Sequence, residues 1–279
     1  MIVVTGATGN VGLPLTQILA AAGEKVIAVS RGVDTAVLPD GVQRHWADLD
    51  DPASLIPALS GAEALFLVVP ALSSDFDPVA VVDAAETSGV SRIVVLSSQT
   101  ISTRPDDSPV TLRHTEKAVE RSGLEWTHLR AGVFASNSLE WAPTVRADRT
   151  VFTAFADVAM PVIDTWDVAD VAAAVLLQPG HGGRAYVLTG GESTSSRQRA
   201  RIIGDALGEP ITVVELTRQQ ARDRLPASMP EPLKESILSF NGSPSPAEQR
   251  VSPDVATILS RAPRTYADWV HRNLDAFRA

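Results

Sequence analysis

Up to Arg130 the chain alternates short apolar runs, rich in β-branched side chains, with segments of helical pattern. The runs are IVVT, KVIAVS, ALFLVV, RIVVLSS and EWTHLR, and segments such as LPLTQILAAAG and DPVAVVDAAETSG stand between them. Strands that are joined through helices run parallel, and the helices then cover both faces of their sheet. The sequence therefore predicts an α/β fold with a Rossmann-type, doubly wound parallel sheet.

The segment TGATGNVG, from Thr5 to Gly12, follows the first strand and opens the first helix. In that context the first glycine permits a tight turn, the second lets a pyrophosphate approach the backbone, and the third lets the helix pack closely. Amide groups at the helix N-terminus then face the anion. The alternative is a plain strand-to-helix turn, but the flanking strand and helix favour a dinucleotide. The predicted contacts are Gly6, Thr8, Gly9, Asn10, Val11 and Gly12.

The second strand ends in VIAVSRG, where an acidic residue would bind the ribose hydroxyls of NAD. Arg31 stands there instead, and a guanidinium pairs well with a 2′-phosphate, so NADP(H) is favoured. A solvated arginine is the alternative, and Asp34 nearby keeps NAD(H) possible. Asp48 is expected at the end of the third strand near the adenine, unless it, Asp50 or Asp51 caps a helix.

Composition narrows the classes of partner. The net charge of −9 provides no basic stripe that would neutralise nucleic-acid phosphates, so we expect no nucleic-acid partner. The chain has no cysteine and its five histidines lack paired ligand spacing, so we expect no metal site. No apolar run reaches the roughly 18 residues of a membrane span, and MIVVTG lacks a signal-peptide pattern. We therefore expect no membrane insertion and a cytoplasmic location.

Beyond Arg130 the alternation loosens and then resumes with DVADVAAAVLLQ and AYVLT. Further on, SSRQRARIIGDALG, ITVVEL and TYADWVHRNLDAFR have the patterns of a helix, a strand and a helix. We expect an NAD(P)-binding Rossmann domain at residues 1–150. Residues 151–279 are expected to form a smaller C-terminal substrate or cap region that is interleaved with the sheet.

Several motifs together resemble the NmrA-like family of atypical short-chain dehydrogenases/reductases. They are TGATGNVG, SR after the second strand, ADLDDPASLIPALSG, LFLVVP, RIVVLSS, SGLEWTHLRAGVFASN and DVADVA. The family includes quinone, triphenylmethane-dye and imine reductases, and also redox-sensing regulators. The resemblance implies that Val69 and Pro70 border the adenosine, although ordinary packing is the alternative. The nicotinamide contacts that it implies are Ser97, Ser98, Gly132, Val133 and Phe134.

Ordinary members of the wider superfamily use a Tyr-x-x-x-Lys pair to relay a proton. The chain has only Tyr186 and Tyr266, and neither is followed four residues later by lysine. The segment RHTEK, which ends at Lys117, has arginine in place of the tyrosine. The catalytic residues are therefore unknown from sequence. Ser98, His114 and Lys117 are candidate polar contacts, although a histidine or lysine on a helix surface is the commoner case.

The missing pair affects the expected reaction. Hydride chemistry belongs to the nicotinamide, and an electron-poor quinone, dye or imine needs little help from an acid. We expect an NADPH-dependent oxidoreductase that acts on a small, apolar, electron-poor acceptor. The alternative is a non-catalytic NADP(H)-binding redox sensor that acts through a protein partner. Four aromatic residues are expected either to line the acceptor pocket or to belong to the core, namely Trp141, Phe152, Phe155 and Trp166.

Overall fold

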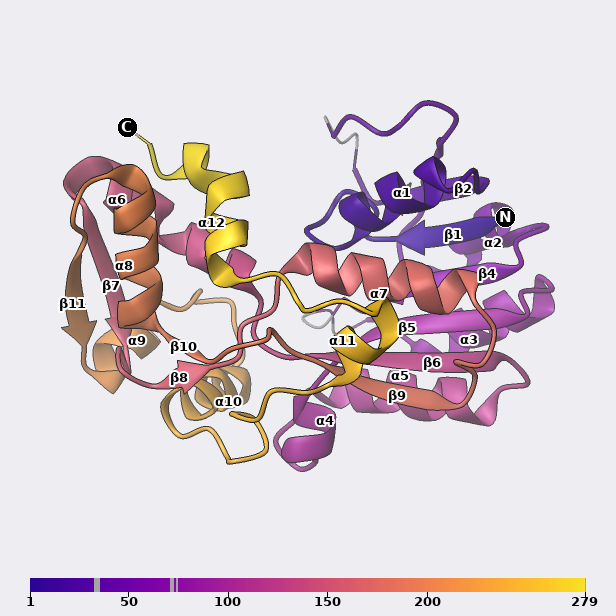
Figure 1. Ribbon diagram of the computed structural model, residues 1–279. Coiled ribbons are helices and arrows are strands. Elements are labelled where there is room, and N and C mark those ends of the chain that lie inside the picture. The colour runs from indigo at the N-terminus through magenta and orange to yellow at the C-terminus, as the bar shows by residue number, and fades with distance from the viewer. Residues whose placement is uncertain (33–35, 71–72, 74, 279) are drawn as a thin grey trace. The chain divides into compact units, whose positions relative to one another are not determined.

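Seven parallel strands form the main sheet of the computed structural model, which describes residues 1–32, 36–70, 73 and 75–278 (Figure 1). The strand order is β3-β2-β1-β4-β5-β6-β9, so the order reverses between β1 and β4. Open α/β sheets bind their ligands at such a reversal. The strands are β1 (Ile2–Thr5), β2 (Val26–Ser30), β3 (Gln43–Trp46), β4 (Ala64–Val68), β5 (Arg92–Ser98), β6 (Glu125–Ala131) and β9 (Arg184–Leu188).

Helices cover both faces of this sheet, as Figure 1 shows. On one face α1 packs against α7, and on the other α3 packs against α5. The predicted Rossmann-type α/β fold is confirmed. The helical elements here are α1 (Gly12–Ala21), η1 (Pro52–Leu55), α2 (Ile56–Leu59), α3 (Pro78–Thr87), α4 (Thr100–Thr103), α5 (Val110–Arg121) and α7 (Thr165–Leu177).

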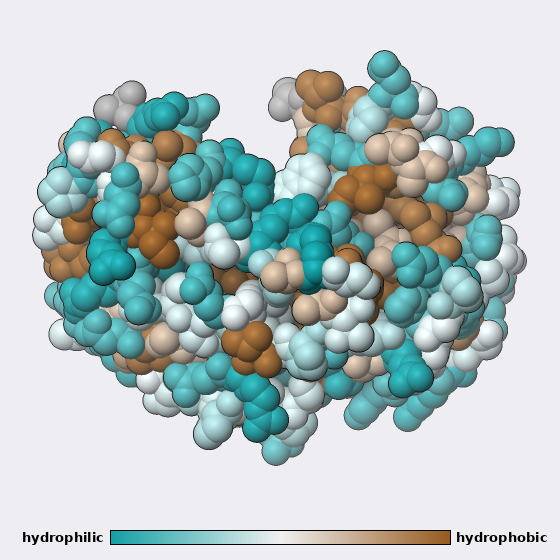
Figure 2. Space-filling view, in the orientation of Figure 1, coloured by the Kyte–Doolittle hydropathy of each residue, from teal (hydrophilic) through white to brown (hydrophobic). Residues whose placement is uncertain are grey.

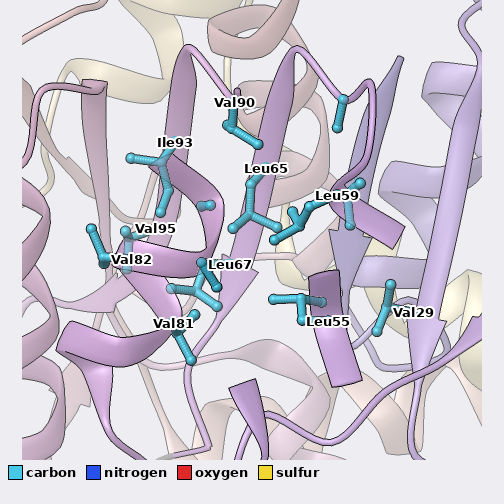
Figure 3. Packing of buried hydrophobic residues seen from close by; sticks show 14 of the residues in the cluster. Val29, Leu55, Leu59, Leu65, Leu67, Val81, Val82, Val90, Ile93 and Val95 are labelled. Atoms are coloured by element: carbon cyan, nitrogen blue, oxygen red, sulfur yellow. The ribbon is translucent and has the colours of Figure 1, made fainter. Parts of the chain in front are cut away.

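A hydrophobic core lies between the sheet and the helical elements η1, α2 and α3 that cover one of its faces (Figure 3). Alternate residues of β4 and β5 point into it, because successive side chains of a strand face opposite sides of the sheet. Leu65 and Leu67 from β4 meet Leu55 from η1 and Val81 from α3, and all four are fully buried. Burying each such side chain stabilises the fold by about 1.5–3 kcal/mol. This packing therefore holds η1, α2 and α3 against the sheet.

The remaining residues form a second compact unit with its own small sheets. β7 pairs with β11 in parallel, and β8 pairs with β10 antiparallel. α8 packs against α12, and Trp269 lies in the core at 2% exposure. The elements are η2 (Ala135–Trp141), α6 (Ala142–Asp148), β7 (Thr150–Ala154), β8 (Ala159–Met160), β10 (Thr194–Ser195), α8 (Ser196–Leu207), β11 (Thr212–Leu216), α9 (Arg218–Arg224), α10 (Glu231–Gly242), α11 (Asp254–Leu259), α12 (Tyr266–Asn273) and η3 (Leu274–Ala276).

The two units are not simple halves of the sequence. The first comprises residues 1–131, 165–188 and 257–260, and the second comprises the rest. The expected boundary after residue 150 falls at the start of β7, inside the second unit. The chain returns to the first unit because α7 and β9 complete the helical layer and the sheet.

The surface mixes polar and apolar side chains. On the face that Figure 2 shows, hydrophilic residues lie between small groups of apolar ones. Large exposed apolar side chains lie far apart along the chain, from Val37 to Val251. Among the described residues, no helix is both long and apolar enough to cross a membrane.

Candidate functional site

A cavity of about 400 Å³ lies in the first unit where β1, β2 and β4 end. This is the reversal point of the strand order, and the backbone turns that follow the three strands form its wall. It brings together seven residues that the sequence singled out. They are Gly6, Thr8, Gly9, Arg31, Asp48, Val69 and Pro70.

Each of the three glycines of the turn is glycine for a different structural reason. Gly6 has a φ of +59°, a conformation that L side chains rarely adopt. A Cβ on Gly12 would lie 2.1 Å from the carbonyl oxygen of Gly6, so α1 could not approach the turn. A Cβ on Gly9 would meet only that same oxygen, at 3.2 Å. The fold therefore requires glycine at Gly6 and Gly12 but only weakly at Gly9, whose free face lines the cavity.

The first turn of α1 keeps unused hydrogen-bond donors. Leu13 N donates to Gly9 O and Leu15 N to Val11 O, which starts the helix. Within the described chain, the backbone N–H groups of Val11 and Gly12 have no acceptor. Unpaired N–H groups at a helix N-terminus, together with the helix dipole, form an anion-binding position. Asn10 is exposed beside them, whereas Val11 is 5% exposed.

A threonine connects two of the strands that form the cavity. Thr5 Oγ1 donates to Phe66 O at 3.2 Å and accepts from Val68 N at 2.8 Å. Its side chain therefore ties the end of β1 to the end of β4, on either side of the reversal point. The sequence predicted the turn that follows Thr5 but gave no sign of this contact, because it joins residues far apart in the chain.

Arg31 lies at the end of β2 with its side chain exposed and on the cavity wall. Its carbonyl accepts a hydrogen bond from Trp46 Nε1 at 2.9 Å, which fixes its backbone. No carboxylate of the described chain pairs with its guanidinium. The guanidinium is therefore available for an anionic group. Asp34, the residue that kept NAD(H) possible, lies outside the described residues.

Of the two roles that the sequence left open for Asp48, it does not take the helix cap of η1, and its place near the adenine stays a prediction. Its side chain lines the cavity, and its Oδ1 also accepts from the backbone N of Asp50 at 3.2 Å. The N-cap residue of η1 is Asp51, whose side chain makes no capping hydrogen bond. Asp48 therefore shapes its own turn while one side stays open to the cavity.

A buried polar group lies under the ends of β5 and β6, and sequence reasoning did not identify it. Ser97 Oγ donates to Glu116 Oε1 at 2.6 Å, and Arg130 donates to both carboxylate oxygens of Glu116, at 3.1 and 2.7 Å. Burial alone would raise the pKa of Glu116, but the hydrogen bonds from Arg130 and Ser97 and the charge of Arg130 lower it below its ordinary value. Ser97 is thus held by α5, while the Ser98 hydroxyl contacts Thr100 Oγ1 at 2.8 Å.

His128 belongs to the same group and is fully buried. Its ring stacks on Trp126, with centroids 4.5 Å apart, and its Nε2 lies 3.4 Å from Glu120 Oε1. Burial lowers the pKa of His128, although the charges of Glu116 and Glu120 oppose the shift. The histidine is therefore neutral near pH 7. The only advance signal for this group was the helical spacing of Glu116 and Glu120, four residues apart in a segment already predicted to be a helix.

His114 and Lys117 lie on another face of α5. Both side chains are exposed and line a groove between α3 and α5 that also contains Asp77 and Asp83. Glu116, between them in sequence, is buried and faces Ser97 instead. The structure thus separates the two candidate residues from the ends of β5 and β6.

The second unit contains a larger cavity of about 850 Å³. Three of the four aromatic residues considered from sequence line it, namely Trp141, Phe152 and Phe155, whereas Trp166 lies on α7 in the first unit. Phe155 has a φ of +54°, and its ring lies where a Cβ on Gly242 would be 2.6 Å away. A non-glycine residue in this conformation is strained, and such strain concentrates at functional sites.

The segment after β6 contributes to this unit. Val133 lines the large cavity, and Phe134 bridges to Ile163 and precedes η2. Gly132 is the first residue of the unit. These three residues were predicted near the nicotinamide, and that role stays a prediction.

The two tyrosines lie outside both cavities. Burial raises the pKa of Tyr266 to about 12, and its side chain lies in the core of the second unit. The hydroxyl of Tyr186 lies 2.8 Å from His181 Nδ1. Tyr186 therefore contacts a histidine and Tyr266 belongs to the core, and neither lines either cavity.

Comparison with known proteins agrees with this geometry. Residues 6–179 match the family model described as NAD(P)H-binding. The (4-alkanoyl-5-oxo-2,5-dihydrofuran-3-yl)methyl phosphate reductase of Streptomyces griseus is 35% identical over 99% of both chains. The NAD(P)H azoreductase of Xenophilus azovorans is 31% identical over the whole of both chains. The NADPH complex of the quinone oxidoreductase QOR2 from Escherichia coli has a TM-score of 0.79 at 26% identity, covering 98% of this chain and 99% of that one.

These matches span the glycine turn, the reversal point and the strands that carry the first cavity. They also extend over the second unit, since both relatives align along nearly the full chain. The protein therefore belongs to the NAD(P)H-binding family.

Proposed function

We propose that the protein is an NADPH-dependent reductase that transfers hydride to a small electron-poor acceptor of the quinone, azo or dye type, without a Tyr-x-x-x-Lys pair. The observation that carries the proposal is the first cavity, whose wall includes an open Gly9 and an Arg31 that pairs with no carboxylate of the described residues. The turn through Gly9 leads into α1, where the N–H groups of Val11 and Gly12 have no acceptor in the described chain. Full-length similarity to two reductases supports the reaction class.

The residues present fit a dinucleotide. The N–H groups of Val11 and Gly12 would bind the pyrophosphate, because nothing in the described chain uses them. Gly9 would let the phosphates approach the backbone, since its open side faces the cavity. Arg31 would pair with the 2′-phosphate of NADPH, and Val69 and Pro70 would border the adenosine half.

When bound, the nicotinamide would supply the hydride. A quinone or azo acceptor then takes one further proton from water to complete the two-electron reduction, whereas a cationic dye is reduced by the hydride alone. The chain's own contribution is then mainly orientation and exclusion of water. An electron-poor acceptor suits this site, because Tyr266 is held protonated in the core and Ser97 is committed to Glu116. A simple ketone would need a positioned acid at the oxygen that receives the charge.

The second unit is proposed to hold the acceptor. Its cavity of about 850 Å³ has the size of a small-molecule site, and aromatic side chains form part of its wall. The Xenophilus relative is named an azoreductase, which supports an aromatic, electron-poor acceptor. We propose this role for the second unit in place of a simple division at residue 150.

Anaerobic oxidation of NADPH against a panel of quinones, azo dyes, cationic dyes, imines and ketones tests the proposal. We expect turnover with at least one electron-poor acceptor and little with ketones. Calorimetry should show NADPH binding more tightly than NADH. Tight NADPH binding with no turnover on any acceptor would contradict the reductase and favour the redox sensor.

A further inference from the structure

Arg199 is a cation on the wall of the large cavity in the second unit. It lies on α8, with its guanidinium carbon 5.2 Å from the ring centroid of Trp141 and 6.0 Å from that of Tyr266. One terminal nitrogen donates to Ser196 Oγ at 2.9 Å, whereas the Nε atom is buried without a hydrogen-bond partner. Burial lowers the pKa of Arg199, which shows that its charge is poorly solvated, although an arginine stays protonated in proteins.

The neighbouring arginines of α8 are arranged differently. Arg197 donates to both carboxylate oxygens of Asp157, at 2.7 and 3.0 Å, and Arg201 lies 4.0 Å from Asp205. Among residues the structure describes, no carboxylate pairs with Arg199. An unpaired, poorly solvated charge is costly, and the two aromatic faces offset only part of that cost. The guanidinium therefore lacks an anion that its neighbours on the same helix have.

The nearest candidate for that anion is Glu140, which also lines the cavity. Its carboxylate interacts with the charge of Arg199 but forms no ion pair with it in the part of the chain that is described. Burial raises the pKa of Glu140, so its negative charge is itself disfavoured in this position. Glu140 therefore offsets the charge of Arg199 only in part.

The rest of the wall favours a flat ligand. Trp141 and Phe152 both line the cavity, and the guanidinium of Arg224 lies 4.5 Å from the Phe152 centroid. Arg224 is exposed, and it too has no carboxylate partner within the described ranges. In addition, Trp141 Nε1 and Ser138 Oγ are buried on the same wall without a hydrogen bond of good geometry, and the polar groups they interact with are Glu140 and the Tyr266 hydroxyl. Unsatisfied buried donors commonly mark a position that a ligand or water completes.

We infer that this cavity binds a flat organic oxyanion, whose carboxylate, sulfonate or phosphate is held by Arg199 while its ring system lies against the aromatic wall. The inference rests on the proposed function, because the anion is the charged group of the acceptor. It changes the expected acceptor from an apolar molecule to an amphipathic one. Arg199 is then the residue that determines specificity, and Arg224 adds positive charge to the same cavity.

A matched pair of probes tests the inference by calorimetry without NADPH. The probes are 1,4-naphthoquinone-2-sulfonate and the uncharged 1,4-naphthoquinone. We expect the sulfonate to bind more tightly to the natural protein. In Arg199→Gln its affinity should fall about tenfold or more, as for a hydrogen bond to a charged group, while that of the neutral quinone changes less than about twofold.

Arg201→Gln is the control, since Arg201 carries the same charge on the same helix but is 79% exposed and outside this cavity. It should leave both affinities unchanged. Arg199→Lys should recover part of the sulfonate affinity, because it restores the charge without the planar fork. Equal losses for both probes in Arg199→Gln would overturn the inference and make Arg199 a purely structural residue. No preference for the sulfonate in the natural protein would overturn it as well.

Arg199→Gln loses two cation–π contacts, so its thermal midpoint is measured first. If that variant does not fold, Glu140→Gln supplies the test. Removing the carboxylate near Arg199 should tighten binding of the sulfonate and leave the neutral quinone unchanged, and no gain would contradict the inference. The binding assay contains no NADPH. A failure here therefore leaves the reductase intact, whereas failure of the reductase would appear as absent NADPH turnover with the neutral quinone.

Discussion

The first cavity is lined by glycines and short side chains at strand ends, and the second includes aromatic and charged side chains. At the end of β1 the wall includes the turn through Gly6 and Gly9, with Arg31 as the one cation among the described lining residues. In the second unit the wall is Trp141, Phe152 and charged side chains such as Arg199. The first arrangement suits a cofactor shared by many proteins, and the second suits a ligand particular to this one.

The contrast also explains how each cavity discriminates. Backbone N–H groups bind any pyrophosphate, so we expect selectivity between NADPH and NADH in the first unit to depend on the side chain of Arg31. In the second unit the cation, the carboxylate of Glu140 and the aromatic rings can each be changed without altering the fold of the main sheet. Relatives can therefore keep the cofactor and change the acceptor.

The strongest test of the glycine-lined site is to add the same side chain at two glycines of one turn. Gly9→Val should lower the affinity for NADPH at least about 100-fold, because the side chain fills space needed by the pyrophosphate. The fold should persist, since a Cβ there contacts only Gly6 O, at 3.2 Å. Calorimetry measures the binding and circular dichroism the fold.

Gly12→Val is the matched control, and we expect it to destabilise the fold rather than to block NADPH binding in a folded protein. Its Cβ would lie 2.1 Å from Gly6 O and 2.8 Å from Ala7 Cα, both of which are backbone atoms. The free energy of unfolding should fall by about 3 kcal/mol or more. If Gly9→Val unfolded the protein as readily, the idea that Gly12 is required by the fold and Gly9 by the ligand would be contradicted.

This distinction explains what could be predicted from sequence. The sheet, its parallel order and the turn at Gly6 follow from periodicity and local residue types, and they proved correct. The pairing of Ser97 with Glu116 and the position of Arg199 depend on which side chains meet across distant elements. The sequence supplied the aromatic residues of the second cavity but not the unpaired charge among them.

Arg31→Ala tests the single side chain on which cofactor choice depends. The affinity for NADPH should fall by roughly 1–3 kcal/mol, about 5- to 150-fold, because a charge-assisted contact to the 2′-phosphate is lost. The affinity for NADH should stay nearly the same. Both are measured by calorimetry on one preparation. Equal losses for the two cofactors would show that Arg31 acts on the shared part of the dinucleotide or on the turn itself.

The dependence of stability on pH tests the contribution of His128, in the buried polar group of the first unit. The pKa of His128 is lowered in the folded protein, so below about pH 6.5 the unfolded chain binds a proton that the folded one does not. The free energy of unfolding should therefore fall with decreasing pH, by up to about 1.4 kcal/mol per unit. His128→Phe keeps a ring against Trp126 and should reduce this slope. Urea unfolding between about pH 7 and pH 5.5 measures it, and an unchanged slope would assign the acid sensitivity to other groups.

The smallest effects are expected at the polar candidates of α5. His114→Ala and Lys117→Ala should each lower kcat less than roughly tenfold, because both side chains are exposed in the groove beside α3, whereas Glu116 faces the strand ends. A general acid usually contributes about 100-fold or more, so a small effect means that proton delivery by these residues does not limit the rate. The assay uses the best acceptor of the panel, after calorimetry has shown normal NADPH binding in both variants. A 100-fold loss of kcat in either would mean that α5 supplies a proton donor through its exposed face. The first unit would then supply a catalytic side chain as well as a site for the cofactor.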